Sequence, residues 1–544
     1  MAKVKLRSLL PARADLVSMR QAPRRDLVAG LTVAIVALPL ALGFGVSSGL
    51  GATAGLVTAI VAGSIAAIFG GSNLQVSGPT GAMTVVLVPI VAAYGPGGVL
   101  TVGLMSGVLL ILLAVGRTGR YMRYVPAPVI EGFTLGIAAV IALQQVPAAL
   151  GVSMHGEQVA VVAWRAVVAF ASAPDWPSVG LAGAVVVIML VGARWRPVIP
   201  FSLVAVALVT ILAELIPLQV SRIGALPSTL PAPSLAFLDL SALGVLLPSA
   251  VAVAALAALE SLLSATVADG MSVNERHDPD RELFGQGLAN LVTPLFGGVP
   301  ATAAIARTAV NVRSGARSRL AAFTHAVTLA LIVFALAPLV ARIPLAALAG
   351  VLLATAVRMI EVASVRALTR SGRADAVVLA LTAVSTVALD LVTAVIVGLV
   401  VAGALALRAI AREAFIEEVP LDVGDHREEE RALLAEHIVA YRFDGPLFFV
   451  AAQRFLLEVA DVEVVILRMS RVSTIDATGA LVLKDVIERL ERRGITVLMS
   501  GVRSGHERML EAMGVIGEDQ VFVTTPQAIA HARGHLHRTG LLPR

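Results

Sequence analysis

Two short stretches, far apart in the chain, decide the fold: QVSGPTGA at residues 75–82 and GGVPATAA at residues 297–304. In each, extended chain leads to a proline, then to small residues and a short apolar run. Proline suits the first turn of a helix, where its missing N–H is not needed, and it pushes the preceding residue toward extended geometry. Each stretch therefore predicts a short helix that begins abruptly after extended backbone.

The composition around these stretches is that of a membrane protein. Of 544 residues, 57% are hydrophobic and only 15% are charged, against about 25% charged residues in soluble proteins. The composition therefore argues against a single soluble enzyme, and it excludes a disordered chain, which would be rich in charge. Cysteine is absent from the sequence, which removes disulfides and thiolate metal sites.

Apolar segments recur along the first three quarters of the chain. A crossing needs roughly 20 apolar residues, and on that scale fourteen segments, some of them short, can be counted. They are residues 27–47, 50–70, 80–93, 98–116, 126–146, 179–193, 199–217, 245–265, 283–297, 301–313, 320–339, 343–359, 375–389 and 391–411. The two short helices are the third and the tenth of these segments, so they are matching members of two seven-segment halves, residues 27–217 and 245–411.

Because each half has an odd number of segments, the two halves must have opposite orientations. The expected fold is a multi-span α-helical membrane protein, built as a 7+7 inverted repeat with two half-helices, followed by a soluble α/β domain. The boundaries are a cytoplasmic N-terminal segment (1–26), a transmembrane transport domain (27–412), an acidic linker (413–437) and the α/β domain (438–544).

Arginines test the expected topology. Most of those between segments fall in the loops that follow even-numbered segments, and the other loops hold only Arg165, Arg222 and Arg342. Positive charge is enriched in cytoplasmic loops, so the N-terminus and the C-terminal domain are both expected in the cytoplasm, with the chain in the cell membrane. The net charge of +5 then reflects topology rather than nucleic-acid binding.

The paired half-helices predict an anion site. Short, Pro/Gly-interrupted segments at matching positions of two halves indicate a transporter site near the membrane midplane, and helix N-termini favour negative charge. The alternative is a pair of re-entrant turns that only pack. The small residues that begin the half-helices, Gly81, Ala303 and Ala304, are candidate substrate contacts.

Two charged residues lie inside apolar segments. A carboxylate such as Glu260 is costly there, so it is expected to face a polar cavity. Ser264 lies one turn further on the same face, and together they could bind Na⁺, or Glu260 alone could take up a proton. Arg307, in the second half-helix, could hold positive potential at an anion site. The alternatives are a headgroup contact for Glu260 and a cytoplasmic anchor for Arg307.

These residues resemble the SulP family of anion transporters, from about residue 26 to the C-terminus. The motifs that carry the resemblance are ALPLALGFG (37–45), SGPT (77–80), LESLLS (259–264), ADGM (268–271), GQGLAN (285–290) and GGVPATAAIART (297–308).

The resemblance implies a fold with core and gate bundles, a homodimer, and a substrate held between the third and tenth segments. By motif position it implies site roles for Leu40, Phe44, Thr80, Ala306 and Arg307. Bicarbonate-transporting members place Asp and Thr at two coupling positions and bind Na⁺ there.

This chain has Glu260 and Ser264 at those coupling positions. Na⁺ coupling, H⁺ coupling and anion exchange therefore stay open, with Thr302 as a third candidate for the coupling site. Leu40 replaces the Gln of many sulfate-type members, which leans toward the bicarbonate branch.

The C-terminal region alternates strand and helix patterns, which indicates a parallel sheet. It resembles a STAS domain, as SulP proteins carry. In related signalling domains, the Asp that corresponds to Asp476 is followed by a phosphorylated Ser, whereas this chain has Ala477 there. The candidate regulatory hydroxyl is therefore that of Thr478. The alternative is that Thr478 only caps the N-terminus of a helix.

The expected function is secondary active transport of a small inorganic anion, sulfate or bicarbonate, without a cofactor beyond a coupling H⁺ or Na⁺. The expected partners are the anion, the lipid bilayer, a second copy of the chain and a cytoplasmic protein bound by the STAS domain, with no nucleic acid. The alternatives are a dicarboxylate or nucleobase transporter on the same fold, and a membrane-anchored STAS signalling protein. An enzyme is not expected, because no nucleophile triad, metal cluster or phosphate-binding glycine motif stands out.

Overall fold

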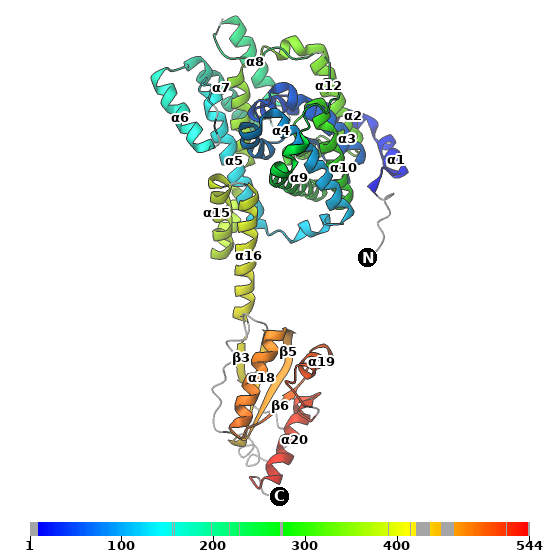
Figure 1. Ribbon diagram of the computed structural model, residues 1–544, viewed down its shortest axis with the longest axis vertical. Helices are drawn as coiled ribbons and strands as arrows, with labels where there is room; N and C mark the ends of the chain where they lie inside the picture. Colours follow the sequence, from blue (N-terminus) through cyan, green and yellow to red (C-terminus); the bar gives the residue numbers. More distant parts are fainter. Residues whose placement is uncertain are drawn as a thin grey trace. The chain divides into compact units, whose positions relative to one another are not determined.

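A computed structural model describes residues 9–541, except 155, 157, 197–198, 217, 228, 273–275, 390, 414, 420–435, 448–461 and 518. The chain divides into two compact units, Met1–Leu399 and Val400–Arg544. The first unit consists mainly of helices, and the second combines helices with a sheet (Figure 1).

The first unit is almost entirely helical. Its helices are α1 (Arg13–Gln21), α2 (Pro23–Ser47), α3 (Ala52–Phe69), α4 (Gly81–Val115), α5 (Ala127–Ala149), α6 (Val159–Ser172), α7 (Trp176–Trp195), α8 (Phe201–Leu215), α9 (Leu243–Met271), α10 (Pro279–Val292), α11 (Ile305–Arg313), α12 (Leu320–Val340), α13 (Leu345–Met359), α14 (Val362–Ser371), α15 (Arg373–Ala388) and the start of α16 (Leu391–Glu413), with 3-10 turns η2 (Gly119–Tyr124), η3 (Leu240–Ala242) and η4 (Thr293–Phe296). Two short strands, β1 (Ser77–Gly78) and β2 (Thr302–Ala303), interrupt this series.

Within the described residues, nine helices are long and apolar enough to cross a membrane. The multi-span helical fold expected from the sequence is confirmed, and the count of fourteen segments stays a prediction. The expected segments at 80–93 and 98–116 are the two parts of α4, which breaks at Gly95, where φ is +67° and Pro96 follows. Glycine adopts this positive φ without a steric penalty.

Three details of the helices differ from the sequence prediction. The second half-helix begins at Ile305 rather than near Ala301, because residues before it pair as β2 instead of entering the helix. The helices α6 and α14 were not predicted. Both are short, with 14 and 10 residues, fewer than the roughly 20 that a full crossing needs.

The helices pack in two groups. The helices α2, α3, α4, α9, α10, α11 and α12 contact one another around β1 and β2, and a second group contains α5, α7, α8, α13 and α15. Small residues bring backbones together in the first group: a Cβ on Gly55 would lie 2.0 Å from the Ala41 carbonyl oxygen. Such close packing is characteristic of membrane helices.

The second unit contains a five-stranded sheet in the order β3-β4-β5-β6-β7. Its strands are β3 (Phe415–Val419), β4 (Ile438–Leu447), β5 (Val464–Ile475), β6 (Thr496–Ser500) and β7 (Val521–Phe522). Only β3 runs antiparallel to its neighbour, and β4 to β7 are parallel. The strand β3 lies within the stretch expected to be a linker, whose residues 420–435 fall outside the described residues.

Helices cover both faces of this sheet, as a parallel sheet requires. The helices α18 (Ala477–Arg492) and α19 (Ser504–Ala512) pack on one hydrophobic core, which includes Leu467 and Leu483. The helix α20 (Thr525–Arg538) packs on the other, which includes Ile466 and Ile529. The alternation of Ile466 and Leu467 between the two cores follows from the two-residue period of a strand.

Candidate anion site

The two half-helices meet at a short antiparallel strand pair. Ser77 pairs with Ala303 and Gly78 with Thr302, and the Ala304 amide donates to the Val76 carbonyl at 3.0 Å. The helix α4 starts directly after β1, and α11 directly after β2. The antiparallel pairing matches the opposite orientation of two inverted halves. It brings two helix N-termini, with their free N–H groups and positive dipole ends, into one region.

Side chains of α10 hold this strand pair in place. Asn290 donates to the Ala301 carbonyl at 2.8 Å and accepts from the Ala301 amide at 2.8 Å. Gln286 donates to the Ser77 hydroxyl at 2.6 Å. Neither amide was assigned a role from the sequence. The signal that could have found them is a pair of amide side chains, four residues apart, inside an apolar segment. The structure buries both completely, and buried amides need hydrogen-bond partners.

Arg307 joins the second half-helix to the start of the first. The side chain is buried, and its Nη2 donates to the Pro79 carbonyl at 2.8 Å. Its Nη1 has no hydrogen-bond partner among the described residues. A Cβ on Gly78, whose φ is +152°, would lie 2.6 Å from that nitrogen. A buried cation with an unpaired donor, next to two helix N-termini, is suited to bind an anion.

Glu260 approaches the same region from α9. The hydroxyl of Thr80, the N-cap residue of α4, donates to Glu260 Oε2 at 2.8 Å. The Thr80 hydroxyl also accepts from the Met83 amide at 3.3 Å. The opposite charges of Glu260 and Arg307 interact across this site. Glu260, Thr80 and Arg307, which come from three separate helices, are therefore neighbours.

The hydroxyls of the other two candidates for the coupling site, Ser264 and Thr302, bond to residues other than Glu260. The Ser264 hydroxyl shares a hydrogen bond of 2.9 Å with Thr308, and the Thr302 hydroxyl shares one of 2.9 Å with Ser261. Thr302 also donates to the Ala257 carbonyl at 3.2 Å. These hydroxyls attach β2 and α11 to α9. The hydroxyl that reaches Glu260 is that of Thr80, and not that of Ser264.

The aromatic ring of Phe44 lies at the start of the first half-helix. A Cβ on Gly81 would be 3.1 Å from the Phe44 ring and 2.2 Å from Ile141, so glycine is required for this approach. Leu40 lies one turn before Phe44 on α2 and is also buried. Phe44 thus covers the N-terminus of α4 with an apolar surface, which strengthens electrostatic interactions near it by lowering the local dielectric constant.

The start of the second half-helix is open on one side. Ala303 is buried and Ala304 partly buried, whereas Ile305 and Ala306 are exposed. The N-terminus of α11 therefore has one accessible side, while Arg307 and Thr308 face the interior.

A cavity of about 450 Å³ lies elsewhere, among α5, α13 and α15. The residues that line it, such as Ala139, Val357 and Val384, carry only apolar side chains. It offers no donor for an anion, so we do not assign the substrate to it. Among the described residues there is also no cluster of His, Cys, Asp and Glu that could hold a metal ion.

In the second unit, Thr478 is exposed near the start of α18. The N-cap of that helix is Asp476, whose carboxylate accepts from the Gly479 amide at 2.7 Å. The Thr478 hydroxyl is therefore not needed as the cap. Its regulatory role stays a prediction.

Family models match both parts of the chain. The model described as the sulfate permease family matches residues 24–382, and a STAS domain model matches residues 432–528. The chain belongs to the sulfate permease family. The resemblance found in the sequence motifs is thereby confirmed, as is the STAS domain.

The curated relatives of this chain include proteins named as sulfate transporters and proteins named as bicarbonate transporters. It is 35% identical to the putative sulfate transporter YvdB of Bacillus subtilis, over 92% of this chain and 96% of the relative. It is 30% identical to the bicarbonate transporter BicA of Picosynechococcus sp., over 94% of each chain.

Solved structures support the fold. The transmembrane domain of a cyanobacterial bicarbonate transporter BicA matches with a TM-score of 0.62 and 32% identity, over 70% of this chain and 97% of that one. The structure of SLC26A9 matches with a TM-score of 0.80 and 16% identity, over 99% of this chain and 95% of that one. At that identity the second likeness shows the fold alone.

Proposed function

We propose that this family member is a secondary active transporter that moves sulfate or bicarbonate across the cell membrane. The observation that carries the proposal is the meeting of the α4 and α11 N-termini at the β1–β2 pair, beside a buried arginine with an unpaired donor. Two helix dipoles and a guanidinium all favour a small anion there. The transport needs no cofactor other than a coupling ion.

The anion sits between the half-helices in this proposal. Arg307 Nη1 and the free amides at the start of α11 bind it, and Phe44 excludes water on the α2 side. Sulfate and bicarbonate both fit such a site, because each presents oxygen atoms to N–H donors. Names of relatives include both anions, which supports an inorganic oxyanion over a dicarboxylate or a nucleobase.

Glu260 carries the coupling, with H⁺ favoured over Na⁺. A bound Na⁺ needs several oxygen ligands, and the hydroxyls of Ser264 and Thr302 already bond to Thr308 and Ser261. The hydroxyl that bonds to Glu260 is a donor, from Thr80. A carboxylate that gains a proton loses its attraction to Arg307, which changes the affinity of the anion site. Protonation and anion binding are thereby linked.

The deciding experiment is an uptake panel in proteoliposomes. Labelled sulfate and bicarbonate are offered at several pH values, with and without Na⁺, and with fumarate and uracil as competitors. We expect uptake of one of the inorganic anions, with no inhibition by either competitor. Inhibition by fumarate or uracil together with no uptake of sulfate or bicarbonate would instead identify an organic substrate.

Arg307→Gln tests the anion site in the same assay. Hydrogen bonds to charged groups are worth about 1.5–3 kcal/mol, so the half-saturating anion concentration should rise roughly tenfold or more. The matched control is Arg313→Gln, nearly two turns later on α11 at an exposed position, which should leave uptake unchanged. Equal effects of both substitutions would contradict the assignment, provided that both variants keep the wild-type thermal midpoint.

The termini are proposed to be cytoplasmic, from the distribution of arginines. A homodimer and a cytoplasmic partner of the STAS domain also stay predictions.

A further inference from the structure

The N-terminal helix α1 has two different faces. Asp15 and Ser18 are partly buried on one face, whereas Arg13, Leu16, Val17 and Arg20 on the opposite face are exposed. The helix has only nine residues, and short isolated helices are marginal in water. Its position therefore depends on what the two faces contact.

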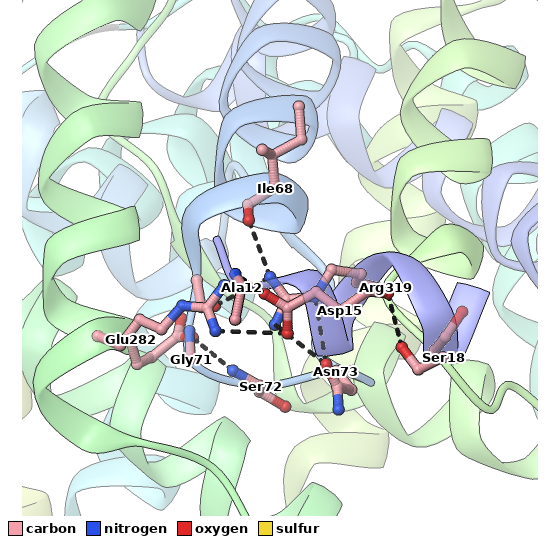
Figure 2. A network of polar contacts seen from close by, with 12 residues as sticks. Ala12, Asp15, Ser18, Ile68, Gly71, Ser72, Asn73, Glu282 and Arg319 are labelled. Atoms are coloured by element: carbon pink, nitrogen blue, oxygen red, sulfur yellow. Dashed lines mark hydrogen bonds and ion pairs between the residues drawn. The ribbon is translucent and has the colours of Figure 1, made fainter. Parts of the chain in front are cut away.

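The inner face is anchored by ion pairs, which Figure 2 shows from close by. The Asp15 carboxylate accepts from Arg281 Nη2 at 2.6 Å and pairs with Arg319 at 3.3 Å. It also accepts from the Ala12 amide at 2.8 Å, which caps the helix. Burial raises the pKa of Asp15, but the hydrogen bonds from Arg281 and Ala12 and the charges of Arg319 and Arg281 outweigh it and lower the pKa overall. The anchor therefore stays ionised at neutral pH.

Arg319, which pairs with Asp15, is itself held by hydrogen bonds to the end of α3 and the residues that follow it. Arg319 donates to the Ile68 carbonyl at 2.8 Å and to the Asn73 side chain at 3.0 Å. Both side chains that contact Asp15, those of Arg281 and Arg319, are buried. The orientation of α1 about its own axis is thus fixed, and so is the choice of residues that face outward.

The outward face carries two large apolar residues between two arginines. Arg13, Leu16, Val17 and Arg20 recur at helical spacing i, i+3, i+4 and i+7, which places them on one face. Leu16 is 61% exposed and Val17 is 57% exposed. The helix therefore turns its two branched apolar side chains away from the protein, while its charged Asp15 points inward.

This apolar face continues into the surface of the first spanning helix. The helix α2 begins at Pro23, two residues after α1 ends, and its exposed side chains include Leu27, Val28 and Leu31. Apolar side chains exposed on a spanning helix face lipid. The exposed Arg24 lies between the two apolar groups in the sequence, and a long arginine side chain can reach lipid headgroups from such a position.

We propose that α1 binds the surface of the bilayer, with Leu16 and Val17 at the edge of the acyl chains and Arg13 and Arg20 on the headgroups of anionic lipids. An interfacial helix has such an apolar face flanked by basic residues, buried about 5–10 Å into the headgroup boundary. Basic residues close to an anionic leaflet are attracted to it. The Asp15 anchor holds the helix in this orientation. The proposal does not depend on which anion is transported.

The first test measures the depth of Leu16. Because the sequence contains no cysteine, Leu16→Cys provides a unique attachment point for a nitroxide in the full-length protein. In vesicles that contain phosphatidylglycerol, the label should be reached more readily by oxygen than by a water-soluble nickel chelate. The matched control is Leu481→Cys, which replaces a leucine that is 54% exposed on the STAS domain, and its label should favour the nickel chelate. Equal nickel accessibility at both positions would overturn the proposal.

The second test concerns the charge. Each basic residue near an anionic surface is worth about 1 kcal/mol, or roughly fivefold in affinity. In vesicles with increasing phosphatidylglycerol, the Arg13→Gln/Arg20→Gln variant should need a higher anionic fraction to bring the Leu16 label into lipid. The matched control, Arg492→Gln/Arg508→Gln, changes two exposed arginines of the STAS domain and should need no more than the wild type.

Two further results would contradict the proposal. One is an unchanged response of the Arg13→Gln/Arg20→Gln variant. The other is shielding of the Leu16 label from both oxygen and nickel chelate, which would indicate a protein partner on this face. A Leu481 label in the same variant background, together with a single peak in size-exclusion chromatography, shows that the variant is folded.

Discussion

Glu260 illustrates how one side chain can be interpreted in two ways from its neighbours in the sequence. Helical spacing places Ser264 on its face, which suggests a shared ion site. In the structure, however, the Ser264 hydroxyl hydrogen-bonds to Thr308, and it is the Thr80 hydroxyl that donates to Glu260. A hydroxyl donor next to a carboxylate fits a group that exchanges a proton, because the partner remains bonded whether or not the second oxygen is protonated.

Glu260→Gln should separate coupling from binding. Glutamine keeps an acceptor for Thr80 but cannot titrate, so stimulation of uptake by an inward proton gradient should be lost. Coupling free energies are typically 1–3 kcal/mol, or about 5- to 150-fold, and the loss should fall in that range. The measurement compares initial uptake rates with and without a pH gradient in proteoliposomes.

Ser264→Ala is the matched control for this variant. With proton coupling, it should keep the response to the pH gradient. If it abolishes a Na⁺ stimulation of uptake, and Glu260→Gln does the same, the coupling ion is Na⁺ and the proton assignment is wrong.

At the scale of elements, the β1–β2 pair determines the geometry of the site. Two residues on each side suffice because α10 secures the strands through Gln286 and Asn290. The extended backbone at Gly78 is tight: its φ of +152° is rarely adopted by other residues, and the Arg307 guanidinium occupies the space of a Cβ. The position of the Arg307 guanidinium beside the start of the first half-helix therefore depends on Gly78.

Gly78→Ala should abolish transport while leaving most of the fold intact. The added methyl group would meet Arg307 Nη1 at 2.6 Å, so the arginine must move away from the anion site. The matched control is Gly180→Ala on α7, where nothing lies within 4 Å of the new atom. Uptake rates and thermal midpoints of both variants provide the measurement, and full activity of Gly78→Ala would contradict the role given to Arg307.

At the scale of the whole molecule, the two units distribute their apolar side chains differently, as lipid and water require. The first unit exposes apolar side chains on its spanning helices, and the second encloses two hydrophobic cores within a covered sheet. The contrast explains the low overall share of charged residues, because the membrane part contributes few of them. It also suggests that the second unit can fold without the first.

Residues 413–544, expressed alone, should unfold cooperatively in urea. Leu467 is fully buried in the larger core. The substitution Leu467→Ala should therefore lower the free energy of unfolding by about 2–5 kcal/mol, because it removes buried apolar surface and leaves a cavity. The control Leu481→Ala changes an exposed leucine and should stay within about 0.5 kcal/mol of the wild type. A non-cooperative transition of the wild-type domain would show that it depends on the membrane part.

The topology can be tested in intact cells, since the sequence contains no cysteine. Leu235→Cys, in a loop expected outside, should react with a membrane-impermeant maleimide. Ser371→Cys, at the end of α14 in a loop rich in arginine, should react only after permeabilisation. Both positions are exposed, so accessibility alone does not distinguish them. The opposite pattern would place the N-terminus outside.

The sequence by itself determined that most of the chain is a multi-span helical membrane part, the places where two segments are broken, the STAS domain and the family. These properties are local: apolar length, proline and glycine positions, and strand and helix periods depend on neighbours in the chain. It also drew attention to Glu260 and Arg307 as charged residues inside apolar segments, and the family resemblance added Thr80.

Only the tertiary structure decided which of these residues meet. The Thr80–Glu260 contact, the attachment of Arg307 to Pro79 and the anchoring of Asp15 to Arg281 join residues that are 180, 228 and 266 positions apart. Such contacts depend on how helices pack, and no periodicity within a segment specifies them. The same holds for α11, which begins at Ile305 because β2 must first pair with β1.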